Sequence, residues 1–210
     1  FGERSPSSTE ITALTDELRQ RVALDQDARE HYQNVARELG PSAFDAPQAP
    51  TLSEAISVMH RVDRENTDWI LAQVRDVGWI DAARFGSEAH ADAFLIVQHS
   101  GDLRLMRAAL PLIEAGLGED PASGQSFALL SDRTRLALGQ SQLYGSQLWG
   151  RAGGGYVVPR LEDPDGVDAR RAALGMSSLD EYLELFRRSG DTVVVQPHER
   201  APVSELGETG

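Results

Sequence analysis

Two residue types are missing from this chain of 210 residues: cysteine, and lysine, because all 20 basic residues are arginine. Without cysteine there are no disulfides, no thiolate nucleophile and no Cys-ligated zinc or iron–sulfur site. Without lysine there is no P-loop or protein-kinase lysine, and no Schiff base to pyridoxal phosphate, since arginine cannot form the imine. These two absences exclude large classes of enzyme.

The sequence also lacks a long apolar run and an excess of positive charge. The longest apolar run, Ala93 to Val97, is five residues long, whereas a membrane helix needs about 18. The net charge of −13 would repel a phosphate backbone. We therefore expect neither a membrane nor a nucleic-acid partner, and the oligomeric state stays open. The first residues lack the pattern of a secretory signal, so a cytoplasmic location is the default expectation.

The composition, with 40% hydrophobic and 25% charged residues, is that of a globular protein. The length favours one domain, expected over residues 9–196 between a flexible N-terminus, 1–8, and a flexible tail, 197–210. Apolar residues at helical spacing predict helices, with a cap at Ser8 or Thr9 and a capping box over Thr51–Glu54. The predicted helices cover residues 9–39, 51–77, 87–100, 102–115, 126–138, 167–174 and 178–188.

The pattern changes after residue 139. Residues 140–161 predict two short strands joined by a turn at Gly153–Gly155, and Thr192–Val195 predicts one more strand. The expected fold is therefore mainly α: a single-domain helical bundle with a small β-hairpin near the C-terminal third.

The first candidate site residues are Gln98 and His99, at the end of the apolar run that begins at Phe94. A histidine among aliphatic side chains favours the neutral imidazole that a general base needs. The alternative is a core histidine bonded to a backbone carbonyl. His90 and His99 are nine residues apart and point to opposite faces of a helix, so we predict no metal site.

Asp132 and Arg133 are adjacent charged residues inside an otherwise apolar helical segment. Neighbouring side chains on a helix diverge by about 100°, so the two serve different partners. The planar fork of Arg133 suits a substrate carboxylate. A buried ion-pair network that joins helices is the alternative.

Neutral polar side chains are concentrated between Gln140 and Gln147. In a strand, Gln142 and Tyr144 would share one face, and such groups suit a polar ligand or an oxyanion. An exposed strand face is equally compatible with the pattern. No dinucleotide fingerprint or Gly-x-Ser-x-Gly elbow is present, and we expect no organic cofactor.

The order of these motifs resembles an uncharacterised bacterial family that is classed as a domain of unknown function, with QH, DR and Q-x-YG[TS]Q motifs. The resemblance covers most of residues 14–188. Ser146 stands where the family has threonine and keeps the hydroxyl, whereas Ile80 replaces the proline of a Gly-Trp-Pro turn. The resemblance implies no reaction, but it implies that the scattered polar residues form one site. The motif residues towards the N-terminus are Asp25, Arg29, Asp63 and Asn66.

The preferred hypothesis is a cofactor-independent enzyme that acts on a small polar or anionic molecule by hydrolysis, elimination or isomerisation. His99 would be the general acid or base, Arg133 and Arg29 would bind an anionic group, and Asp132 would orient a cation. Tyr144 would join His99 and Asp132 as a catalytic residue that bonds the substrate. The other substrate-binding residues would be Gln98, Gln142, Gln147, Asp25, Asp63 and Asn66. The side chains of His99, Arg133 and Tyr144 should then converge. The alternative is a non-catalytic binding or immunity-type module, whose acidic surface meets a basic partner and whose polar cluster is structural.

Overall fold

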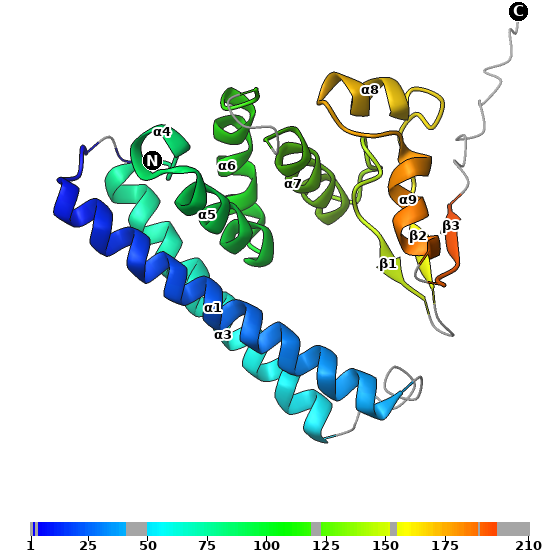
Figure 1. Cartoon of the computed structure of the whole chain (residues 1–210), viewed down its shortest axis with the longest axis horizontal. Helices are drawn as coiled ribbons and strands as arrows, with labels where there is room; N and C mark the ends of the chain where they lie inside the picture. Colours follow the sequence, from blue (N-terminus) through cyan, green and yellow to red (C-terminus); the bar gives the residue numbers. More distant parts are fainter. Residues whose placement is uncertain are drawn as a thin grey trace, which may run out of the picture.

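Two long helices form an antiparallel hairpin that extends from one end of the protein (Figure 1). In this computed structural model, α1 is Ser8–Leu39 and α3 is Pro50–Val77. The structure describes residues 2, 4–40, 50–118, 123–151, 155–188 and 190–196. The predicted tail, 197–210, therefore lies outside the described residues.

Shorter helices pack at the base of this hairpin. They are α4 (Ala82–Phe85), α5 (Ser87–His99), α6 (Leu103–Ala115) and α7 (Ser123–Ala137). The apolar run is buried as expected, with Ile96 and Val97 almost fully inside. One large hydrophobic core joins α1, α3, α5, α6 and α7. Within the described part of the chain, no helix is both long and apolar enough to cross a bilayer.

The C-terminal third contains a small sheet and two helices. The strands are β1 (Trp149–Gly150), β2 (Tyr156–Val158) and β3 (Val193–Val195), and the helices are α8 (Val167–Ala173) and α9 (Leu179–Arg188). β1 pairs antiparallel with β2, and β2 pairs in parallel with β3. Val158, Leu161, Val167, Leu179 and Leu183 form a second, smaller core there. The predicted mainly helical fold with a small hairpin near the C-terminal third is confirmed.

Local chemistry explains where several helices begin. The Ser7 hydroxyl accepts the N–H of Glu10, whose carboxylate accepts the N–H of Ser7, so the cap of α1 lies one residue before Ser8. Asp102 caps α6 as predicted, because its carboxylate accepts two backbone N–H groups. The capping box predicted at Thr51 is wrong, since Thr51 already lies inside α3. Residues 2 and 4 bond to the end of α3 through backbone and side chain.

The largest departure from the sequence-based prediction lies between α7 and β1. Residues 140–148 were expected to begin a strand, but they run as a loop whose one ladder contact is the bridge between Gln142 and Leu161. Helix α7 also starts three residues earlier than Ser126, and the short helix α4 was not predicted. Hydrogen bonds to buried side chains, described below, determine the conformation of this loop, and it forms no continuous strand ladder.

Candidate functional site

A buried carboxylate contacts the candidate histidine. Asp25 on α1 has a side chain that is 1% exposed, and its Oδ2 lies 2.9 Å from Nδ1 of His99 at the end of α5. The other ring nitrogen of His99, Nε2, has no hydrogen-bond partner within the described residues, and 17% of the side chain is exposed. The arrangement places one ring nitrogen against an acid, and the His99 side chain keeps a small exposed surface.

Arg29 competes with Asp25 for the same ring nitrogen. Its Nε lies 3.0 Å from Nδ1 of His99, and its Nη2 lies 2.8 Å from Oδ1 of Asp63 on α3. A protonated Nδ1 donates to Asp25, whereas an unprotonated Nδ1 accepts from Arg29, so the two contacts alternate. Arg29 Nη1 is buried without a hydrogen-bond partner among the described residues.

Arg133 joins α7 to the end of α5. Its Nη1 donates to the carbonyl of Gln98 at 2.6 Å, and its Nε donates to Oε1 of Gln147 at 3.2 Å. Burial and the nearby positive charge of Arg29 lower the pKa of Arg133 from its ordinary value. Within the described residues, Arg133 makes no ion pair with a carboxylate. Two guanidinium groups therefore lie close together at His99, and one of them lacks a counter-charge.

Asp132, expected to orient a cation, makes no ion pair among the described residues and bonds a loop. Its carboxylate is fully buried and accepts the backbone N–H groups of Leu143, Tyr144 and Ser146, together with the Ser146 hydroxyl. A carboxylate that accepts several N–H groups fixes the shape of a loop. Asp132 therefore positions the 140–148 loop, and the acid beside His99 is Asp25.

Two of the glutamines serve the same loop. Gln142 is fully buried, donates to the carbonyls of Gln147 and Pro159, and accepts the N–H of Gln147. Its amide is engaged on both sides, so the expected contact with a ligand is not available to it. The Gln147 side chain bonds Arg133 and the carbonyl of Leu129. Gln147 therefore holds the loop against α7, and Gln142 ties the loop to itself and to Pro159.

Two further candidates lie apart from His99. The Tyr144 ring packs edge-on against Phe127, and none of its side-chain contacts among the described residues reaches His99 or Arg133. Asn66 exchanges hydrogen bonds of 3.4 Å with Arg21, using its side-chain oxygen and nitrogen. His99 and Arg133 are thus linked through Gln98, whereas Tyr144 connects to Arg133 only through the loop backbone and α7.

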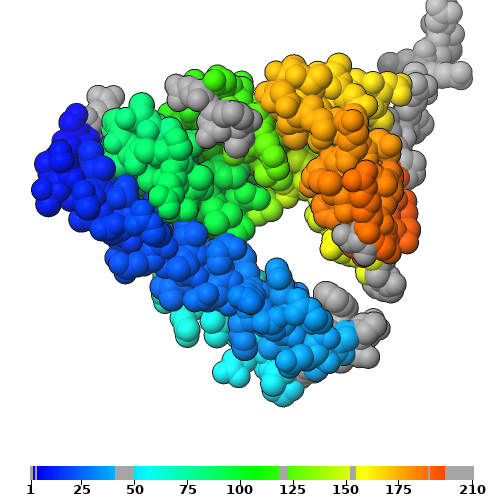
Figure 2. All heavy atoms as spheres, viewed as in Figure 1, coloured from blue at the N-terminus to red at the C-terminus, as the bar shows by residue number. Residues whose placement is uncertain are grey.

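The cluster at His99 lies where the helical hairpin meets the rest of the protein. Figure 2 shows an open notch between the far half of α1 and α3 and the C-terminal helices and sheet. Asp25 and Arg29 belong to α1, Asp63 to α3 and Arg133 to α7, and Gln147 lies in the loop that follows α7. Across the described segments, no three histidine or acidic side chains gather in a way that could hold a metal ion.

Sequence reasoning missed a buried cation near this loop. Arg171 on α8 is 1% exposed and donates to the carbonyls of Tyr144 and Ser177. The adjacent pair Arg170–Arg171 gave no sign of this, because a buried and a surface arginine look alike in a helical pattern. Only the tertiary contacts separate them.

The chain belongs to a family of unknown function, DUF6624, whose model matches residues 17–194. The resemblance expected from the motifs is thereby confirmed at the level of the family. Comparison with curated proteins and comparison with solved structures gave no significant match.

Proposed function

We propose that this member of the DUF6624 family is a cofactor-independent enzyme that acts on a small anionic molecule at His99. The observation that carries the proposal is the contact between buried Asp25 and His99 Nδ1, next to an arginine without a carboxylate partner. The reaction classes compatible with it are hydrolysis, elimination and isomerisation, since each requires a proton to be moved.

His99 is the proton carrier in this proposal. With Nδ1 donating to Asp25, Nε2 has a free lone pair and can accept a proton from the substrate or from water. The carboxylate of Asp25 then stabilises the imidazolium that forms. In that state Arg29 cannot donate to Nδ1 and is held by its bond to Asp63.

The two arginines give the site its preference for an anion. Arg133 presents the N–H groups that do not bond Gln98 or Gln147, and a guanidinium binds a carboxylate or phosphate through two parallel hydrogen bonds. With His99 neutral, Asp25 and Asp63 balance the charges of Arg29 and Arg133. An incoming anion therefore adds one negative charge to a neutral cluster that contains an unpaired guanidinium.

The rival function is a non-catalytic module in which the same cluster is structural. Its specific support is that Arg29 bridges α1, α3 and α5 through Asp63 and His99. A cluster that only joins helices would contribute stability and would need no exposed ring nitrogen.

The test separates the two functions with conservative variants. Thermal-shift screening of small carboxylates and phosphate esters against the wild type identifies a ligand, and turnover of that ligand is followed by NMR. His99→Gln should keep the fold and lose turnover at least about 100-fold, because glutamine cannot carry a proton near neutral pH. Arg133→Lys should weaken ligand binding by about tenfold, since lysine loses the planar fork.

The matched control is His31→Gln, on the exposed surface of α1 two residues beyond Arg29. It should match the wild type in melting temperature and in turnover. The structural alternative predicts the opposite pattern: His99→Gln and Arg133→Lys would lower the melting temperature, and no ligand found in the screen would be turned over by the wild type. That pattern would overturn the enzymatic proposal.

A further inference from the structure

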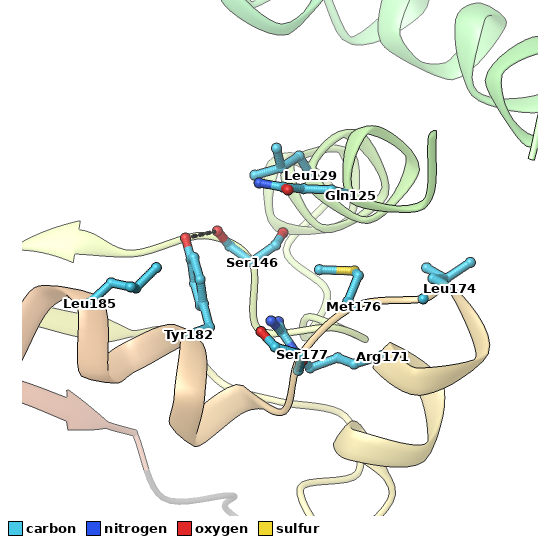
Figure 3. A pocket seen from close by; sticks show the side chains of 10 residues that line it. Gln125, Leu129, Ser146, Arg171, Leu174, Met176, Ser177, Tyr182 and Leu185 are labelled. Carbon is cyan, nitrogen blue, oxygen red and sulfur yellow. Dashed lines mark hydrogen bonds between the residues drawn. The ribbon is translucent and has the colours of Figure 1, made fainter. Parts of the chain in front are cut away.

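A second hollow lies on the other side of the 140–148 loop, between α7 and α9. The pocket has a volume of about 250 Å³. Figure 3 shows Gln125 and Leu129 of α7 on one wall, Tyr182 and Leu185 of α9 on the other, and Arg171 between them. None of the residues assigned above to the His99 cluster lines this pocket.

The base of the pocket holds a buried guanidinium with unused donors. Arg171 Nε donates to the Ser177 carbonyl at 2.7 Å, and Nη1 donates to the Tyr144 carbonyl at 2.8 Å. A guanidinium has five N–H donors, so three of them have no acceptor within the described residues. Arg171 is only 1% exposed, and its side chain is one of those that line the pocket.

The charge of Arg171 also lacks a direct counter-ion. It makes no ion pair with a described carboxylate, and the ring of Tyr182 lies 5.1 Å from its guanidinium carbon. Burial lowers the pKa of Arg171 from its ordinary value, yet an arginine remains protonated in proteins. The carboxylates of Asp168 and Asp132 act on Arg171 without a direct ion pair and oppose that lowering of its pKa. An anion that enters the pocket would supply the hydrogen-bonded counter-charge that Arg171 lacks among the described residues.

The rest of the lining combines apolar side chains with the polar residues Gln125, Ser146 and Ser177. The apolar groups are those of Leu129, Leu174, Met176 and Leu185, and the Tyr182 hydroxyl donates to the Ser146 carbonyl. Inorganic phosphate would leave the apolar side chains without contacts. A carboxylate with a short apolar body would bond Arg171 and cover the leucine and methionine side chains.

We propose that this pocket is a binding site for a small monocarboxylate with an apolar body, distinct from the cluster at His99. The carboxylate accepts hydrogen bonds from Arg171, and the hydrocarbon part lies among Leu129, Leu174 and Met176. The site requires no chemistry from His99, so its occupancy is independent of the function proposed above.

The probes are the carboxylates acetate, butyrate and hexanoate. Hexanamide is the control without a charge, and inorganic phosphate is the anionic control without an apolar body. Isothermal titration calorimetry on the full chain at constant ionic strength gives the affinities. Two added methylene groups should raise the affinity of butyrate over acetate by about tenfold. Hexanamide should bind at least about tenfold more weakly than hexanoate, because it loses charge-assisted hydrogen bonds. Phosphate should bind more weakly than butyrate.

Substitution of Arg171 would also remove its bonds to two backbone carbonyls and could disturb the fold. The test variant therefore changes a residue at the edge of the pocket. Gln125 is exposed on α7, and Gln125→Glu places a negative charge at the pocket mouth. It should weaken hexanoate binding several-fold, whereas Gln20→Glu, on the exposed surface of α1, should leave binding unchanged. His99→Gln should also leave it unchanged.

Three results with the carboxylate series would overturn the proposal, and two further results would contradict it. They are equal binding of hexanoate and hexanamide, hexanoate binding that Gln125→Glu does not weaken, and no binding of any carboxylate in the series. Phosphate binding as tight as that of hexanoate would equally contradict the apolar half of the site. Loss of hexanoate binding in His99→Gln would assign the carboxylate to the other cluster and would end the claim of a separate site.

Discussion

At the scale of single residues, Asp132 fixes the conformation of a whole loop, which its position inside a helix does not suggest. One fully buried carboxylate accepts three backbone N–H groups and one hydroxyl from the loop that lies between the two candidate sites. Hydrogen bonds to a charged group contribute about 1.5–3 kcal/mol each, although they do not add fully. Arg133 and Arg135 of α7 also bond this loop, but each of them reaches one loop residue, whereas Asp132 reaches three.

Asp132→Asn should therefore destabilise the protein strongly. The amide replaces one acceptor oxygen with an NH2 group, which would face the N–H donors of the loop. We expect the free energy of unfolding to fall by about 2–4 kcal/mol in urea denaturation. Asp165→Asn, in an exposed turn, removes the same charge and should change it by less than about 0.5 kcal/mol. Equal stability of the two variants would contradict the anchoring role.

Two tyrosines predict a loss of stability at alkaline pH. Burial raises the pKa of both Tyr144 and Tyr182 above the ordinary value. The folded chain therefore keeps phenolic protons that the unfolded chain releases near pH 10, so this contribution is present below about pH 10 and is lost as the pH rises through the raised values.

Urea titrations between pH 8 and about 11 measure this loss. Tyr182→Phe should flatten the fall of the free energy of unfolding with pH, because one of the two buried phenols is gone. Tyr32→Phe, on α1, should leave the wild-type slope. A slope that is unaffected by Tyr182→Phe would show that the alkaline loss has another origin.

At the scale of elements, a glycine sets how closely α7 approaches the end of α8. A Cβ placed on Gly124 would lie 2.0 Å from the carbonyl oxygen of Leu174, so the two backbones are in direct contact there. No real side chain tolerates that distance. The contact also borders the pocket, since Leu174 lines it beside Arg171.

Gly124→Ala should push these two elements apart. We expect a loss of about 1–3 kcal/mol in the free energy of unfolding, and a weaker affinity for hexanoate if the pocket widens. Gly150→Ala is the matched control, because a Cβ there would have no atom within 4 Å and the backbone is not in the left-handed region. A Gly124→Ala protein as stable as Gly150→Ala would contradict the close approach.

The elements could be predicted from the sequence wherever periodicity determined them. The buried run at Ile96 and the carboxylate cap at Asp102 act locally, so the helices around them were predictable. The loop after α7 was not, because Gln142 and Asp132 fold it through contacts that are distant in the chain. For the candidate site, the residues could be named, but the pairing of His99 with Asp25 needed two helices to meet, and Arg171 gave no signal at all.

At the scale of the whole molecule, two hydrophobic cores of unequal size share one chain. The larger core spans α1 and α3 to α7, whereas the smaller contains Val158, Leu161, Val167, Leu179 and Leu183. The contacts between them include polar ones, such as the bonds from Asp132 and Arg171 to the 140–148 loop. Stability is therefore expected to differ between the two parts.

Native-state hydrogen exchange should resolve these two parts. Amides of α5 are expected to exchange most slowly, whereas those of α8 and α9 should exchange at least about tenfold faster, through opening of the smaller core. Asp132→Asn should accelerate exchange in α8 and α9 more than in α5. Uniform protection across α5, α8 and α9 would show that the two cores unfold as one.

The parallel pairing of β2 with β3 has a consequence for synthesis on the ribosome. β2 leaves the ribosome before α8 and α9, whereas its parallel partner β3 follows these two helices. Until then β2 has only the two-residue strand β1 beside it, and a short isolated hairpin is marginal in water. One edge of the central strand thus stays open to other nascent chains throughout the translation of two helices, and β3 closes it.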